Sequence, residues 1–132
     1  MRVCILHQHS GLSIAASLQK GIEEQGHQVD LIDVEKERGK IVSHYNYVVV
    51  GSKATTLFGG KISEQTETFL KQGGTLGGKR SFAYIEKRGL RLNKSLQALM
   101  KIMESQGMFI TYSDILNSPS YAYQVGKRLK IN

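Results

Sequence analysis

Short apolar runs alternate along the chain with segments in which apolar residues recur every three or four positions. The apolar runs and strict alternations predict five strands, at residues 3–6, 28–33, 47–50, 81–86 and 108–112. The three-to-four spacing predicts helices over residues 13–25 and 93–107, while Ser63 as a helix cap and Pro119 in a first turn predict helices over residues 63–72 and 119–129. Residues 35–44 are polar and without a strong period, which predicts a short helix or a loop. Strands that alternate with helices in this way predict a doubly wound α/β domain of three layers around a parallel sheet.

The bulk properties fit one domain over residues 1–132, of which 40% are apolar and 22% are charged. The longest apolar runs, such as residues 47–50, are far too short to span a bilayer, so no membrane association is expected. Met1 leads directly into a strand rather than into a secretory leader, and Cys4 has no second cysteine to pair with. These features predict a cytoplasmic protein.

The formal net charge is +7, and the basic residues concentrate between residues 79 and 101. This basic block comprises Lys79, Arg80, Lys87, Arg88, Arg91, Lys94 and Lys101, against one acid, Glu86. Such a block is either a solvated helix face with its loop or a docking surface for an anionic partner. Phe82 and Tyr84 are the aromatic residues within it, so the interleaved aromatics of single-strand nucleic-acid binders are missing and nucleic acid is not an expected partner.

The polar segment His7–Ser13 lies between the first strand and the first helix. A loop at this place brings backbone N–H groups and serine hydroxyls to a helix N-terminus, where the helix dipole favours an anion such as a phosphate. Ser10 or Ser13 is, on the plainer interpretation, the N-cap of the helix. His7 and His9 have no third metal-ligating neighbour in sequence, so a metal site is not expected.

Other doubly wound families are disfavoured by what their chemistry requires. The loop after the first strand has no carboxylates, unlike that of a response-regulator receiver, and the chain has no P-loop motif. A dinucleotide-binding turn needs three glycines where residues 10–13 have one, although Asp33 lies about where a ribose-binding acid would be. Cys4 comes too early for a phosphocysteine loop.

Three loops and the order of elements resemble the flavodoxin-like family over nearly the whole chain. Ser10, Gly11 and Ser13 can be laid on the T/S-x-T-G-x-T phosphate loop of flavodoxins. Residues 51–60, which end in Phe58-Gly59-Gly60, resemble the loop after the third strand, and residues 86–90 correspond to the loop after the fourth. The resemblance implies a five-stranded sheet of order 2-1-3-4-5, whose ligand crevice lies between the ends of strands 1 and 3.

The same resemblance implies an FMN cofactor. Its phosphate would be held by His9, Ser10, Gly11, Leu12 and Ser13. Its ring would lie between a loop with Ser52, Thr55, Thr56, Phe58 and Gly59 and a loop with Lys87, Arg88 and Gly89. The function implied is that of an FMN-binding redox protein, either an electron carrier or a small flavin reductase, with an acidic redox partner. The alternative is a flavodoxin-like domain without flavin that acts as a binding or regulatory module through the basic block.

Overall fold

The computed structural model describes residues 1–53, 62–72, 76–86 and 92–132. Five parallel strands form one sheet in the order β2-β1-β3-β4-β5, as the sequence predicted. The strands are β1 (Arg2–His7), β2 (Gln28–Asp33), β3 (Tyr47–Ser52), β4 (Arg80–Glu86) and β5 (Phe109–Leu116). The helices are η1 (His9–Gly11, one 3₁₀ turn), α1 (Leu12–Glu23), α2 (Glu64–Gln72), α3 (Leu92–Ser105) and α4 (Pro119–Arg128).

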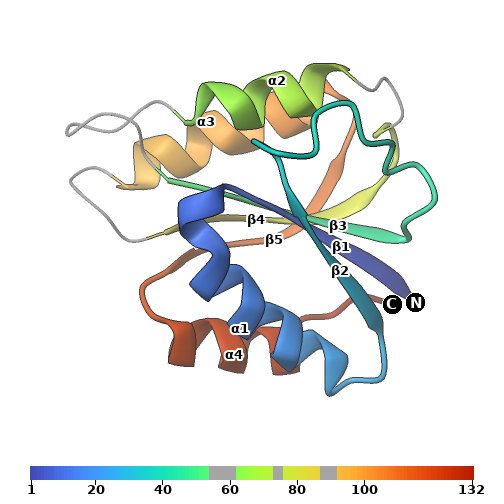
Figure 1. Ribbon diagram of the computed structural model, residues 1–132, viewed down its shortest axis with the longest axis vertical. Helices are drawn as coiled ribbons and strands as arrows, with labels where there is room; N and C mark the ends of the chain where they lie inside the picture. The colour runs from blue at the N-terminus through green and yellow to red at the C-terminus, as the bar shows by residue number, and fades with distance from the viewer. Residues whose placement is uncertain (54–61, 73–75, 87–91) are drawn as a thin grey trace.

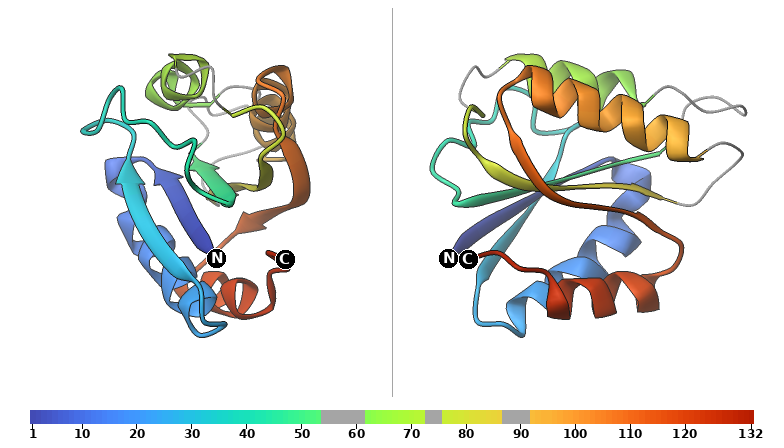
Figure 2. Two further views of the ribbon diagram at one scale, coloured as in Figure 1. Left: turned by 90° about the vertical axis from the view of Figure 1, so that its right-hand side faces the viewer. Right: turned by 180° about the vertical axis from the view of Figure 1, so that it is seen from behind.

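Helices cover both faces of the sheet, α1 and α4 on one side and α2 and α3 on the other (Figure 1; Figure 2). Each face has its own apolar core, and the central strand β3 is buried over its whole length. The uninterrupted run of β-branched residues Val48–Val50 suits a strand that packs against helices on both sides. Burial in β1 raises the pKa of the Cys4 thiol to about 12, so this cysteine is a core residue.

Of the two structures expected for residues 35–44, a short helix or a loop, the chain forms the loop: residues 35–46 are turns, and the first of them is closed by hydrogen bonds from the N–H groups of Lys36 and Glu37 to the carbonyl of Asp33. One strand differs from the sequence-based expectation. Strand β5 continues to Leu116, beyond the predicted end at Tyr112, because it stays paired with β4 as far as Glu86. The second half of this half-exposed edge strand contains polar residues, so the pattern of apolar residues did not predict it.

The described helices include none that is long and apolar enough to cross a membrane. The predicted helix stops are confirmed at two glycines, since Gly26 and Gly107 follow α1 and α3 with φ values of +95° and +81°. Such left-handed backbone is strained for other residues, which is why glycine ends these helices.

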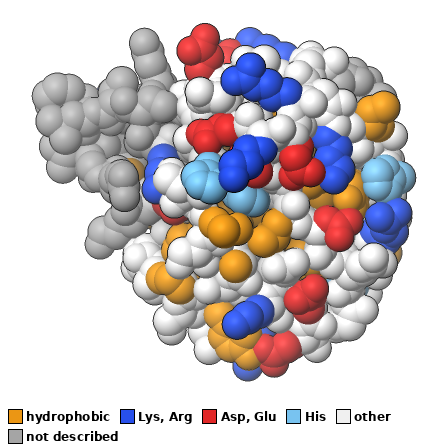
Figure 3. All heavy atoms as spheres, viewed as in Figure 1, with side chains coloured by type: hydrophobic (Ala, Val, Ile, Leu, Met, Phe, Trp, Pro, Cys, Tyr) orange, Lys and Arg blue, Asp and Glu red, His pale blue; other side chains and the backbone are white. Residues whose placement is uncertain are grey.

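The basic block does not form one surface in the described part of the chain. Lys79 and Arg80 lie at the amino end of β4, whereas Lys94 lies in the first turn of α3, near the opposite edge of the sheet. The Lys79 ammonium donates hydrogen bonds to the backbone carbonyls of Ser43 and Tyr45. Figure 3 shows a face on which basic, acidic and histidine side chains lie next to one another. Lys87, Arg88 and Arg91 lie outside the described residues, so a docking surface over residues 79–101 stays a prediction.

Candidate functional site

The loop between β1 and α1 is a single tight turn at the carboxyl edge of the sheet. After His7 the chain makes one 3₁₀ turn, His9–Gly11, which the Gly11 N–H closes by donating to the Gln8 carbonyl at 2.9 Å. Helix α1 then starts at Leu12. The turn thus places the first residues of α1 next to the carboxyl ends of the central strands.

Helix α1 begins without a side-chain cap. Its N-cap residue is Gly11, which is buried and has no side chain that could accept a hydrogen bond from a helix N–H group. Ser10 and Ser13, on either side of it, are exposed, so the interpretation of either serine as the N-cap is wrong. Leu12 is also exposed, at 47%. The hydroxyls of Ser10 and Ser13 thus lie on either side of a glycine at a helix start. These are the positions they take when the segment is aligned with the phosphate loop of flavodoxins.

Gln8 joins the ends of β1 and β3. Its side-chain Oε1 accepts from the Lys53 backbone N–H at 2.7 Å and from the Ser52 hydroxyl at 3.2 Å. Ser52 Oγ in turn accepts from the N–H of Ser63, whose own hydroxyl caps α2 by accepting from the Thr66 N–H. Ser52 is fully buried, so this predicted ligand residue links Gln8 of the β1–α1 turn to Ser63 at the start of α2.

Opposite charges lie against the turn. The Lys53 ammonium donates to the Ser10 carbonyl at 3.1 Å. The carboxylate of Glu86, at the end of β4, packs directly on the Gly11 backbone, so that a Cβ at Gly11 would overlap with Glu86 Oε2. A carboxylate is the kind of group that the start of a helix favours, since the partial charge there is positive. The chain itself therefore supplies an anion where a phosphate would bind.

His9 is oriented by acids that follow β2. Its ring Nδ1 lies 3.2 Å from Asp33 Oδ2, and its backbone N–H donates to Glu35 Oε2 at 3.3 Å. Burial on its own raises the pKa of the Asp33 carboxyl, but backbone N–H donors of Glu35 and Lys36, together with His9, outweigh it and lower the pKa below 3.8. The His9 ring, with its side chain 60% exposed, is thus turned toward Asp33.

The structure brings five of the predicted ligand residues to one turn, His9 to Ser13, and places Ser52 next to it. The remaining seven lie outside the described residues: Thr55, Thr56, Phe58, Gly59, Lys87, Arg88 and Gly89. Gln8, Lys53 and Glu86 were not predicted as site residues. Each stands at or just after the end of a parallel strand, and carboxyl ends of parallel strands meet at one edge, which is the signal that could have found them.

Comparison with known proteins supports the architecture. No protein-family model and no curated protein matches the sequence. Among solved structures, two-electron reduced flavodoxin of Megasphaera elsdenii superposes with a TM-score of 0.76 at 16% identity, covering 96% of each chain. The protein has the flavodoxin-like fold.

Two further neighbours share this flavodoxin-like fold. Oxidised flavodoxin 1 of Bacillus cereus matches with a TM-score of 0.71 at 16% identity, over 98% of this chain and 99% of its own. A flavone reductase matches with a TM-score of 0.69 at 10% identity, over 96% of this chain but 61% of its own. In sheets of order 2-1-3-4-5 the ligand crevice lies where the strand order reverses, between β1 and β3. The Gln8–Ser52 junction marks that point here.

Proposed function

We propose that the protein binds FMN at the carboxyl edge of the sheet and acts as a flavodoxin-like redox protein, either an electron carrier or a small flavin reductase. One observation carries the proposal: α1 starts at an uncapped glycine between two exposed serines, at the switch point of the sheet. The flavodoxins among the structural neighbours support it, and so does the flavone reductase. The net charge of +7 favours an acidic partner protein.

The residues of the β1–α1 turn fit the phosphate end of FMN. The hydroxyls of Ser10 and Ser13 and the backbone N–H groups of residues 11–13 would donate to the phosphate oxygens, and the Lys53 ammonium would add a positive charge beside them. His9, turned toward Asp33, would contribute its ring to the rim of the site. The isoalloxazine ring would lie between the loops that follow β3 and β4, and when bound it would supply the electron transfer.

The fit carries one condition, which concerns Glu86. Its carboxylate lies against Gly11, and two anions at this spacing repel each other. The phosphate therefore binds only when the Glu86 side chain moves off the glycine. The Glu86 carboxylate and the FMN phosphate therefore compete for the place next to Gly11, and this competition lowers the affinity for FMN.

Titration of FMN with the purified protein, followed by quenching of flavin fluorescence, tests the proposal. We expect saturable binding that Ser10→Glu weakens about hundredfold, because a second carboxylate is added beside the phosphate. Ser43→Glu, at an exposed serine in the loop before β3, is the matched control and leaves the affinity unchanged. Absence of quenching in the unmodified protein, or equal weakening by both variants, would contradict the proposal.

A second candidate, a flavin-free binding or regulatory module, is favoured by the same Glu86 contact, because the turn already holds an anion of its own. Glu86→Gln separates the two functions. The redox proposal expects FMN affinity to rise about tenfold in this variant, since a like charge is removed. Glu104→Gln, at an exposed acid of α3, provides the control. A protein that binds FMN neither before nor after the Glu86 substitution would be the flavin-free module.

A further inference from the structure

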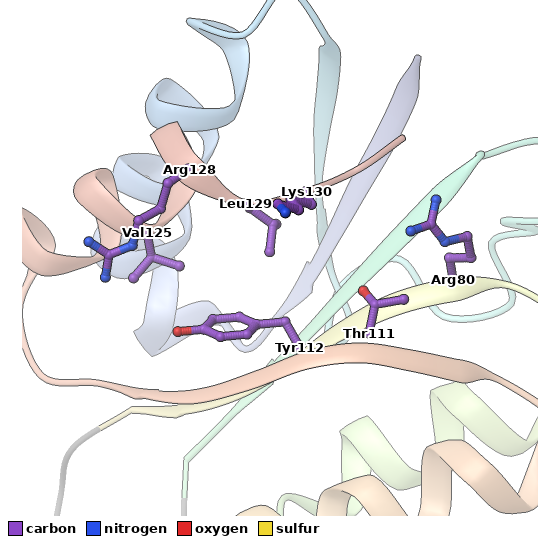
Figure 4. Close-up of a pocket in the computed structure, with 7 residues that line it drawn as sticks. All are labelled: Arg80, Thr111, Tyr112, Val125, Arg128, Leu129 and Lys130. Carbon is purple, nitrogen blue, oxygen red and sulfur yellow. The ribbon is translucent and has the colours of Figure 1, made fainter.

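A cavity of about 420 Å³ lies on the α1/α4 side of the sheet, between β5 and the C-terminal part of α4 (Figure 4). Its residues come from the start of β4, the first half of β5, the last turns of α4 and the segment that follows α4. These parts belong to the amino edge of the sheet, opposite to the β1–α1 turn. The cavity is therefore separate from the flavin site proposed above, and its size is that of a small-molecule site.

An irregularity in β5 lies at this cavity. Ser81 pairs with Ile110, but the next residue, Phe82, pairs with Tyr112, so Thr111 is an extra residue in the strand. Ile110 packs in the core of the α2/α3 face, whereas the Tyr112 ring contacts Phe82 in the core of the α1/α4 face. In a regular strand these two side chains would share a face. The bulge thus turns Thr111 and Tyr112 together toward α4.

The middle of the cavity is apolar and its ends are basic. Val125 and Leu129 point from α4 and its end toward the Tyr112 ring on β5, and Arg80 and Arg128 lie at opposite ends (Figure 4). Lys130 adds a third cation, and the described residues that line the cavity include no acid. None of these three cations takes part in an ion pair within the described parts of the chain. The Tyr112 hydroxyl donates to Asp114 Oδ2 at 3.0 Å, which sets a carboxylate against the Arg128 end, so the excess of positive charge lies at the Arg80 end. An apolar floor beside such a charge suits an amphipathic anion.

Arg80 is the better anchored of the two arginines. It is half-buried, and its Nη1 donates to the Ile131 carbonyl at 3.0 Å, which fixes the guanidinium and leaves its other N–H groups to a ligand. Arg128 is exposed and lies over the Tyr121 ring, 5.9 Å from its centroid. Thr111 Oγ1 already donates to the Ser81 carbonyl and lies 2.8 Å from the Tyr47 hydroxyl. At that end the anion-binding donors therefore belong to Arg80.

We propose that this cavity binds a small organic acid, with its apolar body between Tyr112, Val125 and Leu129 and its carboxylate on Arg80. The site requires no flavin, and no step of it depends on the β1–α1 turn. Because guanidinium and carboxylate form a charge-assisted pair in a partly enclosed place, the charge of the ligand decides its affinity.

The test is a ¹H–¹⁵N NMR titration of the full chain with 2-naphthoate and with 2-naphthamide, its neutral analogue of the same shape. We expect saturable shifts confined to residues 79–81, 109–113 and 122–131, with a dissociation constant of about 1 mM or tighter for the acid. The amide should bind about tenfold more weakly, and Arg80→Gln should weaken the acid to the same degree. Lys94→Gln removes an exposed cation on the other face of the sheet and leaves binding unchanged.

Because Arg80 also holds the Ile131 carbonyl, a second variant keeps the proposal independent of that contact. Tyr112→Ala removes a 40% exposed ring from the cavity wall, and it should weaken the binding of the acid and of the amide to the same degree. Equal affinity for the acid and the amide, an unchanged affinity in Arg80→Gln or Tyr112→Ala, or shifts scattered over the surface would each overturn the proposal.

Discussion

Helices α1 and α4 lie side by side on the same face of the sheet and both begin at its carboxyl edge, yet their first turns are held in different ways (Figure 1). Helix α4 is capped by its own sequence. Ser118 is extended and its hydroxyl accepts from the Tyr121 N–H at 3.1 Å, while Pro119 occupies the first helical turn. Both devices act within four residues.

Helix α1 begins at Gly11 without such a cap, and residues distant in sequence hold its first turn. The Lys53 ammonium donates to the Ser10 carbonyl, and Asp33 contacts the His9 ring. One helix start is therefore complete by itself, while the other depends on the ends of neighbouring strands. Only the second leaves its hydroxyls to a ligand, which is why the proposed binding site is at α1 rather than α4.

The largest effect is expected where the two helices touch. Gly21 and Gly126 face each other, and a Cβ at Gly126 would lie 2.5 Å from the Leu18 carbonyl oxygen, a backbone atom that cannot move aside. In Gly126→Ala the overlap costs about 3 kcal/mol, and the better helix propensity of alanine returns about 1 kcal/mol. We expect a net loss of about 2 kcal/mol in the free energy of unfolding, measured by urea denaturation.

Gly77→Ala is the matched control for this substitution. Gly77 is exposed in a turn, and a Cβ there would meet nothing within 4 Å. Its stability should change by less than about 0.5 kcal/mol. Equal stability of the two variants would mean that α1 and α4 do not pack through these glycines. Their first turns could then no longer be compared as those of two helices packed against each other.

A smaller effect separates the two helix starts directly. Ser118→Ala removes the side-chain cap of α4 and should lower the free energy of unfolding by about 1 kcal/mol. Ser10→Ala removes a hydroxyl that caps nothing, so its stability should stay within about 0.3 kcal/mol of the unmodified protein, while its FMN affinity falls. Urea denaturation and the flavin titration report the two quantities. A stability loss at Ser10 as large as that at Ser118 would contradict the distinction.

The same contrast explains what the sequence could predict. The five strands and the four α-helices follow from local patterns, namely apolar runs and periodicity, Ser63 before α2 and Pro119 in the first turn of α4, whereas the strand order was implied by the resemblance to flavodoxins. The position of the β1–α1 turn was predictable because a helix had to follow a buried strand. These features need no knowledge of distant residues.

Features that depend on contacts between distant segments were not predicted. The Glu86 carboxylate reaches Gly11 from β4, 75 residues later in the chain (86 − 11), and the Gln8 side chain reaches the end of β3. The bulge at Thr111 is likewise set by pairing with β4, and no glycine or proline marks it in the sequence. Side chains at the ends of parallel strands meet only after the sheet has formed, so their partners cannot be assigned from spacing.

The smallest effect concerns the support of α1 by Asp33. Because the pKa of this carboxyl is lower in the folded protein than its ordinary 3.8, its charge stabilises the fold above that pH, and the contribution is lost as the pH falls through the folded pKa. Asp33→Asn should therefore be less stable at pH 7, by less than about 1 kcal/mol because the His9 partner is exposed, and should lose less on acidification. Urea denaturation at pH 7 and in steps below pH 4 measures both, with Glu104→Gln on exposed α3 as the control for loss of a carboxylate. If Asp33→Asn follows the same acid profile as the unmodified protein, His9 is not held through the Asp33 charge, and the turn before α1 depends on the contacts of Lys53, Gln8 and Glu35.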